Sequence, residues 1–394
     1  MKLNHKHSLY ACCAGYVTQA IVNNLMPLLF ATFKTSYGIS LDKIGLLITI
    51  NFVIQMAVDF SAAKYTDKIG CRSMIVFAHF AAAAGLVLLG LTPVLSPGNI
   101  YPMLIASTAV YAVGGGLIEV LVSPMVEALP MENKAGTMSL LHSFYCWGQL
   151  AVTLLSTLFF AIVGIENWRY LAVIWAVIPF LNAFAFLKVP VYVLNGESKG
   201  MSMKQLFSIR LFWMLVILMI GAGASELAMS QWSSYFAEMG LGVSKTVGDL
   251  LGPCMFAVFM GISRLMYSKI SVKFDLTRAI TASSIMCIAC YAAATLSPFP
   301  LLSIAGCALC GFSVGIMWPG VYSLAAKKFS SGGTMMFALL ALAGDVGCST
   351  GPSIVGWLSD ALGGTDSAIK IALLSIVVFP VLMVVTMRFV KSEQ

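Results

Sequence analysis

Apolar runs of about 20 residues recur from one end of this chain to the other, and this recurrence constrains its fold more than any other feature. A helix rises 1.5 Å per residue, so about 20 apolar residues cross the roughly 30 Å hydrocarbon core of a bilayer. Membrane-spanning strands would give short alternating segments instead, and no such pattern is present in the sequence. The composition agrees, because 59% of the 394 residues are hydrophobic and only 10% are charged. We therefore predict an all-α integral membrane protein.

The spacing of these runs predicts twelve transmembrane helices, which places both termini on one side. Their expected ranges are 9–33, 43–63, 73–95, 101–127, 137–163, 169–189, 209–236, 247–268, 279–297, 301–325, 334–360 and 367–389. The first run follows Lys2 and Lys6. It is too long for the apolar core of a signal peptide, so we keep it as a helix of the mature protein.

Most of the 23 lysines and arginines fall in loops on the side of the two termini. Because positive residues are retained in cytoplasmic loops, we predict a multi-pass protein of the plasma (cytoplasmic) membrane with both termini cytoplasmic. The net charge of +7 then follows from membrane orientation and requires no nucleic-acid partner. The lipid bilayer is the expected surrounding, and we expect a monomer.

Ten cysteines raise the question of disulfides or a metal site. Nearly all lie within predicted helices, including "CIAC" (287–290) and "CALC" (307–310). Small, weakly polar packing residues are the simpler interpretation. We therefore expect no metal.

The longest polar stretch between predicted helices is "PVYVLNGESKGMSMKQLFSIR" (190–210), which is rich in turn formers and charge. It divides the chain into six plus six helices. We predict an N-terminal bundle over 1–190, a cytoplasmic linker over 191–207 and a C-terminal bundle over 208–394.

The two halves also resemble each other weakly. "GGGLIEVLVSPMV" (114–126) parallels "GFSVGIMWPGV" (311–321), and "GTMSLLHSFYCWGQ" (136–149) parallels "GTMMFALLALAGD" (333–345). Such internal repeats are typical of secondary transporters. The last match places Gln149 opposite Asp345.

With these features the chain resembles the major facilitator superfamily over its whole length. The loop "AKYTDKIGCR" (63–72) resembles the family signature between helices two and three, with Asp67, Lys68 and Arg72 kept and Ala63 and Cys71 departing from it. The resemblance implies two pseudo-symmetric bundles that rock about a site near the bilayer midplane. It also implies a gating role for Asp67, Lys68 and Arg72, whereas the residues alone would indicate a solvated loop ion pair.

Carboxylates within the apolar runs are the strongest functional signal. A charged side chain at the centre of a membrane helix costs at least about 2.5–3.5 kcal/mol, so it is expected beside a cavity, a partner or a transported proton. Glu119 shares a helix face with Gly115, Gly116 and Ser123. We expect it to line a wet cavity and to couple transport to protons. A structural ion pair, for which Arg264 is the obvious cation, is the alternative.

Three further residues are candidates for proton coupling. Glu226 lies within the seventh predicted helix, on a face that it shares with small residues, and Asp345 lies within the eleventh. An acid such as Asp345, which has no cation nearby in sequence, either binds something or takes up a proton. His142 lies in the fifth helix, where an imidazole can relay a proton near neutral pH. A hydrogen-bonded packing histidine is the competing interpretation for His142.

Amide and indole side chains are the candidates for binding a solute. Gln231 and Trp232 suit a polyhydroxylated ligand, because an amide both donates and accepts hydrogen bonds while an indole covers an apolar face. Trp232 fits an interfacial belt equally well. Asn23 and Asn24 precede Pro27, a possible binding kink, although bonding between helices would also explain them.

Gln149, the repeat partner of Asp345, completes the candidate solute site. Asp59 and Arg264 lie near the inner ends of the second and eighth helices. There, ion pairs of a gate or snorkelling to the interface are expected.

Within the superfamily, the chain is most similar to the fucose permease group of proton–sugar symporters. "LIEVLVSPMV" (117–126) resembles the helix-four pattern of that group, with Glu119 in place of its proton-linked acid and Ser123 in place of an Asn. "NNL" (23–25) resembles its helix-one motif, but Pro27 stands where that motif has an acid. The resemblance implies import of a small polar solute, a sugar, with a proton as the coupling ion and no cofactor.

Three other functions compete with proton-coupled sugar symport. A proton-driven exporter of drugs or metabolites would share the fold. A membrane-embedded enzyme is disfavoured, because no nucleophile–base arrangement, H-E-x-x-H motif or phosphate loop is present in the sequence. A non-transporting sensor would retain the same binding site.

Overall fold

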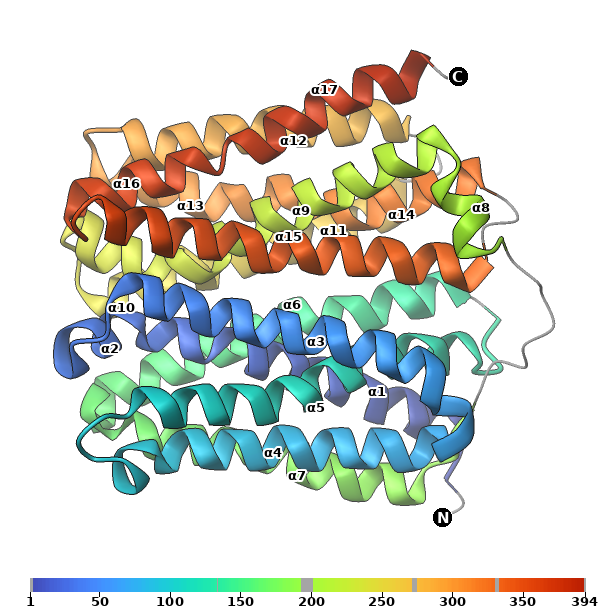
Figure 1. Ribbon diagram of the computed structural model, residues 1–394, viewed down its shortest axis with the longest axis horizontal. Coiled ribbons are helices and arrows are strands. Elements are labelled where there is room, and N and C mark those ends of the chain that lie inside the picture. Colours follow the sequence, from blue (N-terminus) through green and yellow to red (C-terminus); the bar gives the residue numbers. More distant parts are fainter. Residues whose placement is uncertain (1–2, 133, 193–200, 271–274, 330–332, 393–394) are drawn as a thin grey trace. The chain divides into compact units, whose positions relative to one another are not determined.

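The computed structural model describes residues 3–132, 134–192, 201–270, 275–329 and 333–392, except for some side chains at helix ends, notably those of 62–68. Every regular element in these ranges is helical. The chain divides into two compact units, the first formed by Met1–Ser40 with Leu47–Asn195 and the second by Leu41–Leu46 with Gly196–Gln394. Figure 1 shows the long helices of each unit running side by side.

The helices up to residue 188 run through the first half of the chain, with a 3₁₀ turn after α1 and another before α7. They are α1 (His5–Asn24), η1 (Met26–Leu29), α2 (Phe30–Tyr37), α3 (Leu41–Ile69), α4 (Cys71–Leu95), α5 (Tyr101–Glu127), α6 (Lys134–Val163), η2 (Ile165–Asn167) and α7 (Trp168–Lys188).

The second half continues in the same way, with two π-helical turns beside α10. Its elements are α8 (Met203–Phe207), α9 (Arg210–Tyr235), η3 (Phe236–Gly240), α10 (Lys245–Asp249), η4 (Leu250–Cys254), α11 (Met255–Ile270), α12 (Leu276–Leu296), α13 (Pro300–Val314), α14 (Met317–Lys328), α15 (Gly333–Ala361), α16 (Asp366–Ser375) and α17 (Val378–Ser392).

The predicted all-α membrane architecture is confirmed. Within the described residues, eleven helical segments are long and apolar enough to cross a membrane. The first predicted span, 9–33, is the twelfth membrane-spanning segment. It is interrupted rather than one continuous helix. Pro27 lies in the 3₁₀ turn between α1 and α2, where a residue without a backbone N–H ends the regular ladder of hydrogen bonds.

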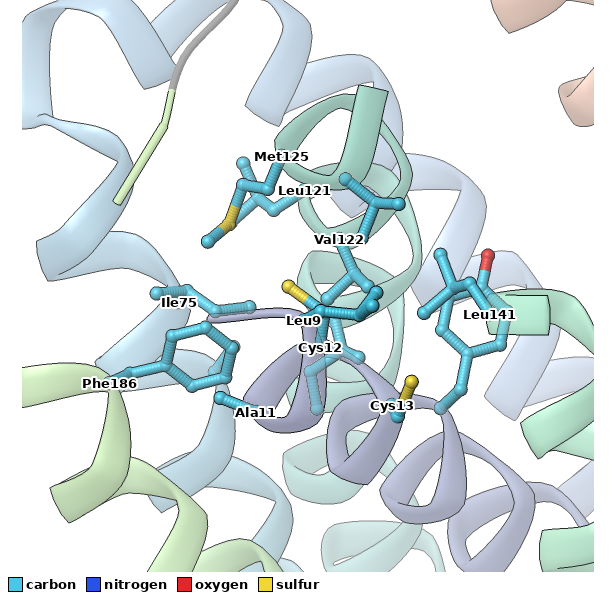
Figure 2. Packing of buried hydrophobic residues seen from close by; sticks show 14 of the residues in the cluster. Leu9, Ala11, Cys12, Cys13, Ile75, Leu121, Val122, Met125, Leu141 and Phe186 are labelled. Atoms are coloured by element: carbon cyan, nitrogen blue, oxygen red, sulfur yellow. The ribbon is translucent and has the colours of Figure 1, made fainter. Parts of the chain in front are cut away.

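The helices of unit 1 close on an apolar cluster to which five of them contribute. Figure 2 shows Cys12 of α1, Ile75 of α4, Leu121 of α5, Leu141 of α6 and Phe186 of α7 in this cluster. Helices α4 and α5 approach closely because glycines lie at their crossing. A Cβ on Gly114 would lie 2.5 Å from the carbonyl oxygen of Ala78, so a larger residue there would force the helices apart.

Unit 2 has a comparable glycine seam between α9 and α15. A Cβ on Gly347 would overlap the carbonyl oxygen of Ile220, and one on Gly351 would lie 2.6 Å from that of Ala224. The two helices therefore meet backbone to backbone. Such contact fixes the side chains that both helices carry.

The ten cysteines are all free, and Cys71 alone among them is not fully buried. The sulfurs of Cys287 on α12 and Cys310 on α13 lie 3.9 Å apart, which is far longer than a disulfide. Packing between helices, as the sequence predicts, accounts for these positions.

Candidate functional site

A network of four amide side chains within unit 1 ends on Glu119. The Nε2 of Gln19 donates to Glu119 Oε2 at 2.7 Å and to Gln55 Oε1 at 2.9 Å. The Oδ1 of Asn23 accepts from Gln55 Nε2 at 3.1 Å and from Asn51 Nδ2 at 3.0 Å. Helix α1 supplies Gln19 and Asn23, α3 supplies Asn51 and Gln55, and α5 supplies the carboxylate.

Small residues on α5 let these amides reach Glu119. A Cβ on Gly115 would lie 3.0 Å from Gln19 Oε1, and one on Gly116 would lie 3.0 Å from the Cα of Gln55. The small face that the sequence shows around Glu119 is thus the surface against which the amides of α1 and α3 pack. Any side chain at Gly115 would crowd the Gln19 carboxamide.

Two buried acceptors of this network have no hydrogen-bond partner among the described residues. They are Gln19 Oε1 and Asn51 Oδ1, on side chains that are 3% and 4% exposed. A buried acceptor without a donor costs about 1–3 kcal/mol, and in natural proteins such atoms point to a ligand or water. The network can therefore receive hydroxyl or N–H groups of a solute.

A second polar contact joins α1 to α5 one turn away. The hydroxyl groups of Tyr16 and Ser123 are 2.8 Å apart, and the His142 ring lies edge-on to Tyr16 with centroids 5.1 Å apart. His142 is half-buried. Its expected place in a proton relay stays a prediction.

The two asparagines of α1 face different neighbours. Asn23 belongs to the amide network. Asn24 instead donates to the carbonyl oxygen of Ala20 in its own helix at 2.9 Å and to the Tyr145 hydroxyl at 3.4 Å. The structure therefore distinguishes between two residues that the sequence left equivalent.

In unit 2, Glu226 lies beside a cation. Arg264 Nη2 on α11 is 3.3 Å from both carboxylate oxygens of Glu226 on α9, and the side chains are 16% and 8% exposed. Arg264 Nε also donates to the Gly315 carbonyl oxygen at 3.4 Å. We expected Glu226 to couple transport to protons, and Arg264 to take part separately in a gate or to snorkel to the interface. The structure brings the two together as a largely buried ion pair.

The Arg264 contact coincides with an interruption of one helix. Helix α13 ends at Val314 and α14 begins at Met317, so the carbonyl of Gly315 lies at the end of a run of α-helical bonds. Such terminal carbonyls need an outside donor. The guanidinium supplies one, and it thereby joins three segments of unit 2.

Trp232 packs between helices, and the stacking role expected for it stays a prediction. Its ring is fully buried, and its Nε1 donates to the Pro352 carbonyl oxygen of α15 at 2.9 Å. Its full burial also argues against a place in an interfacial belt, because a tryptophan there keeps one end of its ring in contact with water.

Gln231, the neighbour of Trp232, keeps its predicted character. Its side chain is 2% exposed, and its Oε1 has no hydrogen-bond partner among the described residues. Unit 2 therefore carries an acceptor of the same kind as the two in unit 1. Gln149 and Asp345 are likewise buried, at 1% and 4% exposure, in units 1 and 2 respectively.

The predicted gate residues are only partly described. The side chains of Asp67 and Lys68 lie outside the described residues. Arg72 Nη1 donates to the carbonyl oxygens of Phe186 and Leu187 at 2.7 and 2.9 Å, so it caps the last turn of α7. Asp59 is half-buried on α3.

Sequence reasoning missed Gln19, Asn51 and Gln55. The signal was present, because Gln19 and Asn23 are four residues apart, as are Asn51, Gln55 and Asp59. Residues four apart share a helix face. Each set is therefore a polar stripe on an otherwise apolar helix. Such a stripe predicts a polar site within the membrane, as a single acidic residue does.

Comparison with known proteins agrees with this architecture. The model of the Major Facilitator Superfamily matches residues 11–352. The membrane protein MosC of Rhizobium meliloti is 22% identical over 351 residues, which cover 88% of this chain and 83% of MosC.

Two solved structures have a similar fold. The E. coli fucose:proton symporter FucP is 18% identical with a TM-score of 0.66, covering 97% of this chain and 98% of its own. An inward-facing, occupied bacterial homologue of the human lysosomal transporter Spinster is 16% identical with a TM-score of 0.76, covering 98% and 96%.

Proposed function

Because this chain belongs to the Major Facilitator Superfamily, whose members are multi-pass membrane transporters rather than enzymes, we propose that it is a secondary active symporter. It carries a small polar solute, a sugar, into the cell together with a proton. It lies in the plasma membrane with both termini cytoplasmic, as the distribution of its basic residues favours.

The observation that carries this proposal is the bond of 2.7 Å between Gln19 and Glu119 inside the amide network. The Glu119 carboxylate is half-buried on a membrane helix and bonded to a neutral amide, whereas Glu226 is bonded to Arg264. A carboxylate within a membrane protein that is bonded to a neutral group becomes much easier to move through hydrocarbon once it is protonated. Glu119 is therefore the proton carrier, and Glu226 is a fixed counter-ion.

Buried acceptor oxygens in each of the two units favour a hydrophilic solute. Gln19, Asn51 and Gln231 each keep a buried carbonyl oxygen that no described residue bonds. Sugar hydroxyls donate hydrogen bonds to such oxygens and also accept them from amide N–H groups. The fold of the fucose:proton symporter FucP is consistent with this solute class.

The test is uptake by proteoliposomes under an imposed pH gradient, with a panel of labelled sugars and related metabolites. One or more sugars should accumulate against a gradient, and dissipating the pH gradient should stop the accumulation. Glu119→Gln should abolish accumulation while sparing exchange of solute across the membrane. Glu127→Gln, at the end of the same helix, is the matched control. Uphill uptake by Glu119→Gln would refute the coupling role.

Export is the second candidate, because neither the Spinster homologue, which is similar in fold, nor MosC, which is similar in sequence, indicates a sugar. Thermal shift distinguishes the two, since a bound ligand raises the melting temperature. Monosaccharides should stabilise a sugar symporter. Stabilisation by lipophilic cations alone would favour a drug exporter.

A further inference from the structure

We propose that the four amides of unit 1 form a relay whose hydrogen-bond direction reverses when Glu119 takes up a proton. The relay consists of Gln19, Gln55, Asn23 and Asn51. It rests on the proposed function only in that Glu119 is the residue that gains and loses the proton.

The observed direction follows from one charged group. A carboxylate only accepts, so Gln19 must turn its N–H₂ toward Glu119, and its second N–H then reaches Gln55 Oε1. Gln55 consequently presents its N–H₂ to Asn23, and the Asn23 oxygen accepts it. Because that oxygen faces the junction, Asn51 also presents its N–H₂ there. The charge on Glu119 thus sets the orientation of all four side chains.

Protonation removes the reason for this direction. A carboxylic acid has an O–H to donate, and the Gln19 carboxamide is the group that already lies 2.7 Å away. If Gln19 turns over, its oxygen accepts from Glu119 and from a turned Gln55. The oxygen of Gln55 then accepts from a turned Asn23, whose second N–H reaches the oxygen of a turned Asn51.

The reversal conserves the number of bonds. Four hydrogen bonds join the five side chains before protonation, and four join them afterwards. The exchange therefore loses no hydrogen bond among these five side chains. Its cost is the rotation of four terminal amides, whose torsions are soft and roughly two-fold.

The two ends of the relay change chemical character. With Glu119 charged, the free groups at the ends are the oxygens Gln19 Oε1 and Asn51 Oδ1. With Glu119 protonated, the free groups at the same places are N–H donors. A solute that fits one pattern of donors and acceptors fits the other less well, so proton occupancy and solute affinity become linked.

Other titratable groups on the helices of unit 1 do not interrupt the relay. They are Tyr16 on α1, bonded to Ser123, Asp59 on α3, one turn beyond Gln55, His79 on α4 and His142 on α6. The His79 ring bonds the Ile75 carbonyl oxygen at 2.8 Å and Asn182 Nδ2 at 2.9 Å. The Gln19–Glu119 bond is direct, so none of these groups lies between them.

Infrared difference spectroscopy on the reconstituted full-length protein tests the relay without any solute. Side-chain amide carbons of Gln or of Asn are labelled with ¹³C, and spectra are recorded as the pH is lowered. The wild type should gain a protonated-carboxyl band together with shifts in both the Gln and the Asn amide bands. Glu119→Gln should lose all three changes, which assigns the carboxyl band to Glu119 rather than to Asp59.

Gln55→Met cuts the relay in its middle and leaves Glu119 and Gln19 in place. It should keep the carboxyl band and the Gln19 shift but lose the Asn shift. Ser61→Ala, on the same helix, where the hydroxyl donates to the Ala57 carbonyl oxygen of its own turn, is the matched control and should behave as wild type. A melting curve shows that each variant is folded.

Two results would overturn the proposal. One is a Glu119 carboxyl band in the wild type without any amide shift, and the other is an Asn shift that survives in folded Gln55→Met. Absence of sugar uptake by the wild type, with the infrared shifts present, would instead refute the sugar symport and leave the relay standing.

Discussion

The ion pair between Glu226 and Arg264 allows a quantitative test of how unit 2 carries charge inside the membrane. Three variants are compared with the wild type: Glu226→Gln, Arg264→Met and the double variant. The first keeps an acceptor for the guanidinium. The second removes both the ion pair and the bond to the Gly315 carbonyl oxygen.

The structure sets the magnitude of the expected effects. At 3.3 Å and an effective dielectric constant of about 20, the attraction between two unit charges is roughly 5 kcal/mol. Most of this offsets the loss of hydration, since the two side chains are only 16% and 8% exposed. Removing one partner of such a pair costs about 3–5 kcal/mol, because the other charge stays buried and unpaired, whereas replacing both partners is often nearly neutral.

We therefore expect Arg264→Met to be the least stable variant and the double variant to recover most of the loss. Thermal unfolding in detergent is the assay. For a unit of about 200 residues, each kcal/mol lowers the Tm by about 2–4 °C, so Arg264→Met should lower it by roughly 6–20 °C. Glu226→Gln should be milder, because its amide oxygen still accepts from Arg264.

The same variants separate a counter-ion from a proton carrier. If Glu226 only balances Arg264, the double variant should retain pH-driven uptake, which Glu119→Gln loses. The reasoning is refuted if the two single losses simply add in the double variant, because the two residues would then not interact.

Three further predictions concern packing and helix ends. Gly347→Ala should lower the Tm by several degrees, because its Cβ would overlap the carbonyl oxygen of Ile220; an unchanged melting curve would contradict the close approach of α9 and α15. Trp232→Phe keeps most of the ring but loses the bond to the Pro352 oxygen, so it should cost about 0.5–1.5 kcal/mol without changing solute affinity, as measured by unfolding and binding assays. Arg72→Ala should expose the end of α7 to faster hydrogen exchange at its last-turn amides, whereas an unchanged exchange rate would argue against the cap.

The sequence predicted the fold well because membrane helices have a strong and local signal. The length of each apolar run predicts whether it spans the membrane, and this prediction does not depend on which helices pack beside it. The interruption at Met26–Leu29 shows the limit of that signal. The proline was visible in the sequence, but the choice between a kink and a 3₁₀ turn depends on how α1 and α2 pack.

The candidate site was predicted less completely, for a physical reason. Glu119 was found because a carboxylate in hydrocarbon is costly wherever it lies. An amide side chain costs less free energy to place in hydrocarbon than a carboxylate does, so the amides that bond Glu119 give a weaker signal. Gln55 is recognisable only through its spacing from Asn51. Trp232 shows that a residue type suited to a ligand can also serve packing between helices, here through its bond to the Pro352 oxygen.

The pairing of Glu226 with Arg264 could not be predicted from either residue alone. The two are 38 positions apart, and the distance between them depends on how α9 and α11 pack. Their contact with Gly315 depends in turn on where α13 ends. Tertiary packing therefore decides which of two similar acids is neutralised by a cation.

The burial of nearly every thiol makes this chain a favourable background for attaching reporters. A water-soluble maleimide would meet Cys71 as its main native competitor, because the other nine cysteines are enclosed by helices. Replacing that one residue would leave a scaffold into which paired spin labels or fluorophores can be introduced. Distances between the two units could then be followed in the bilayer as pH and solute are varied.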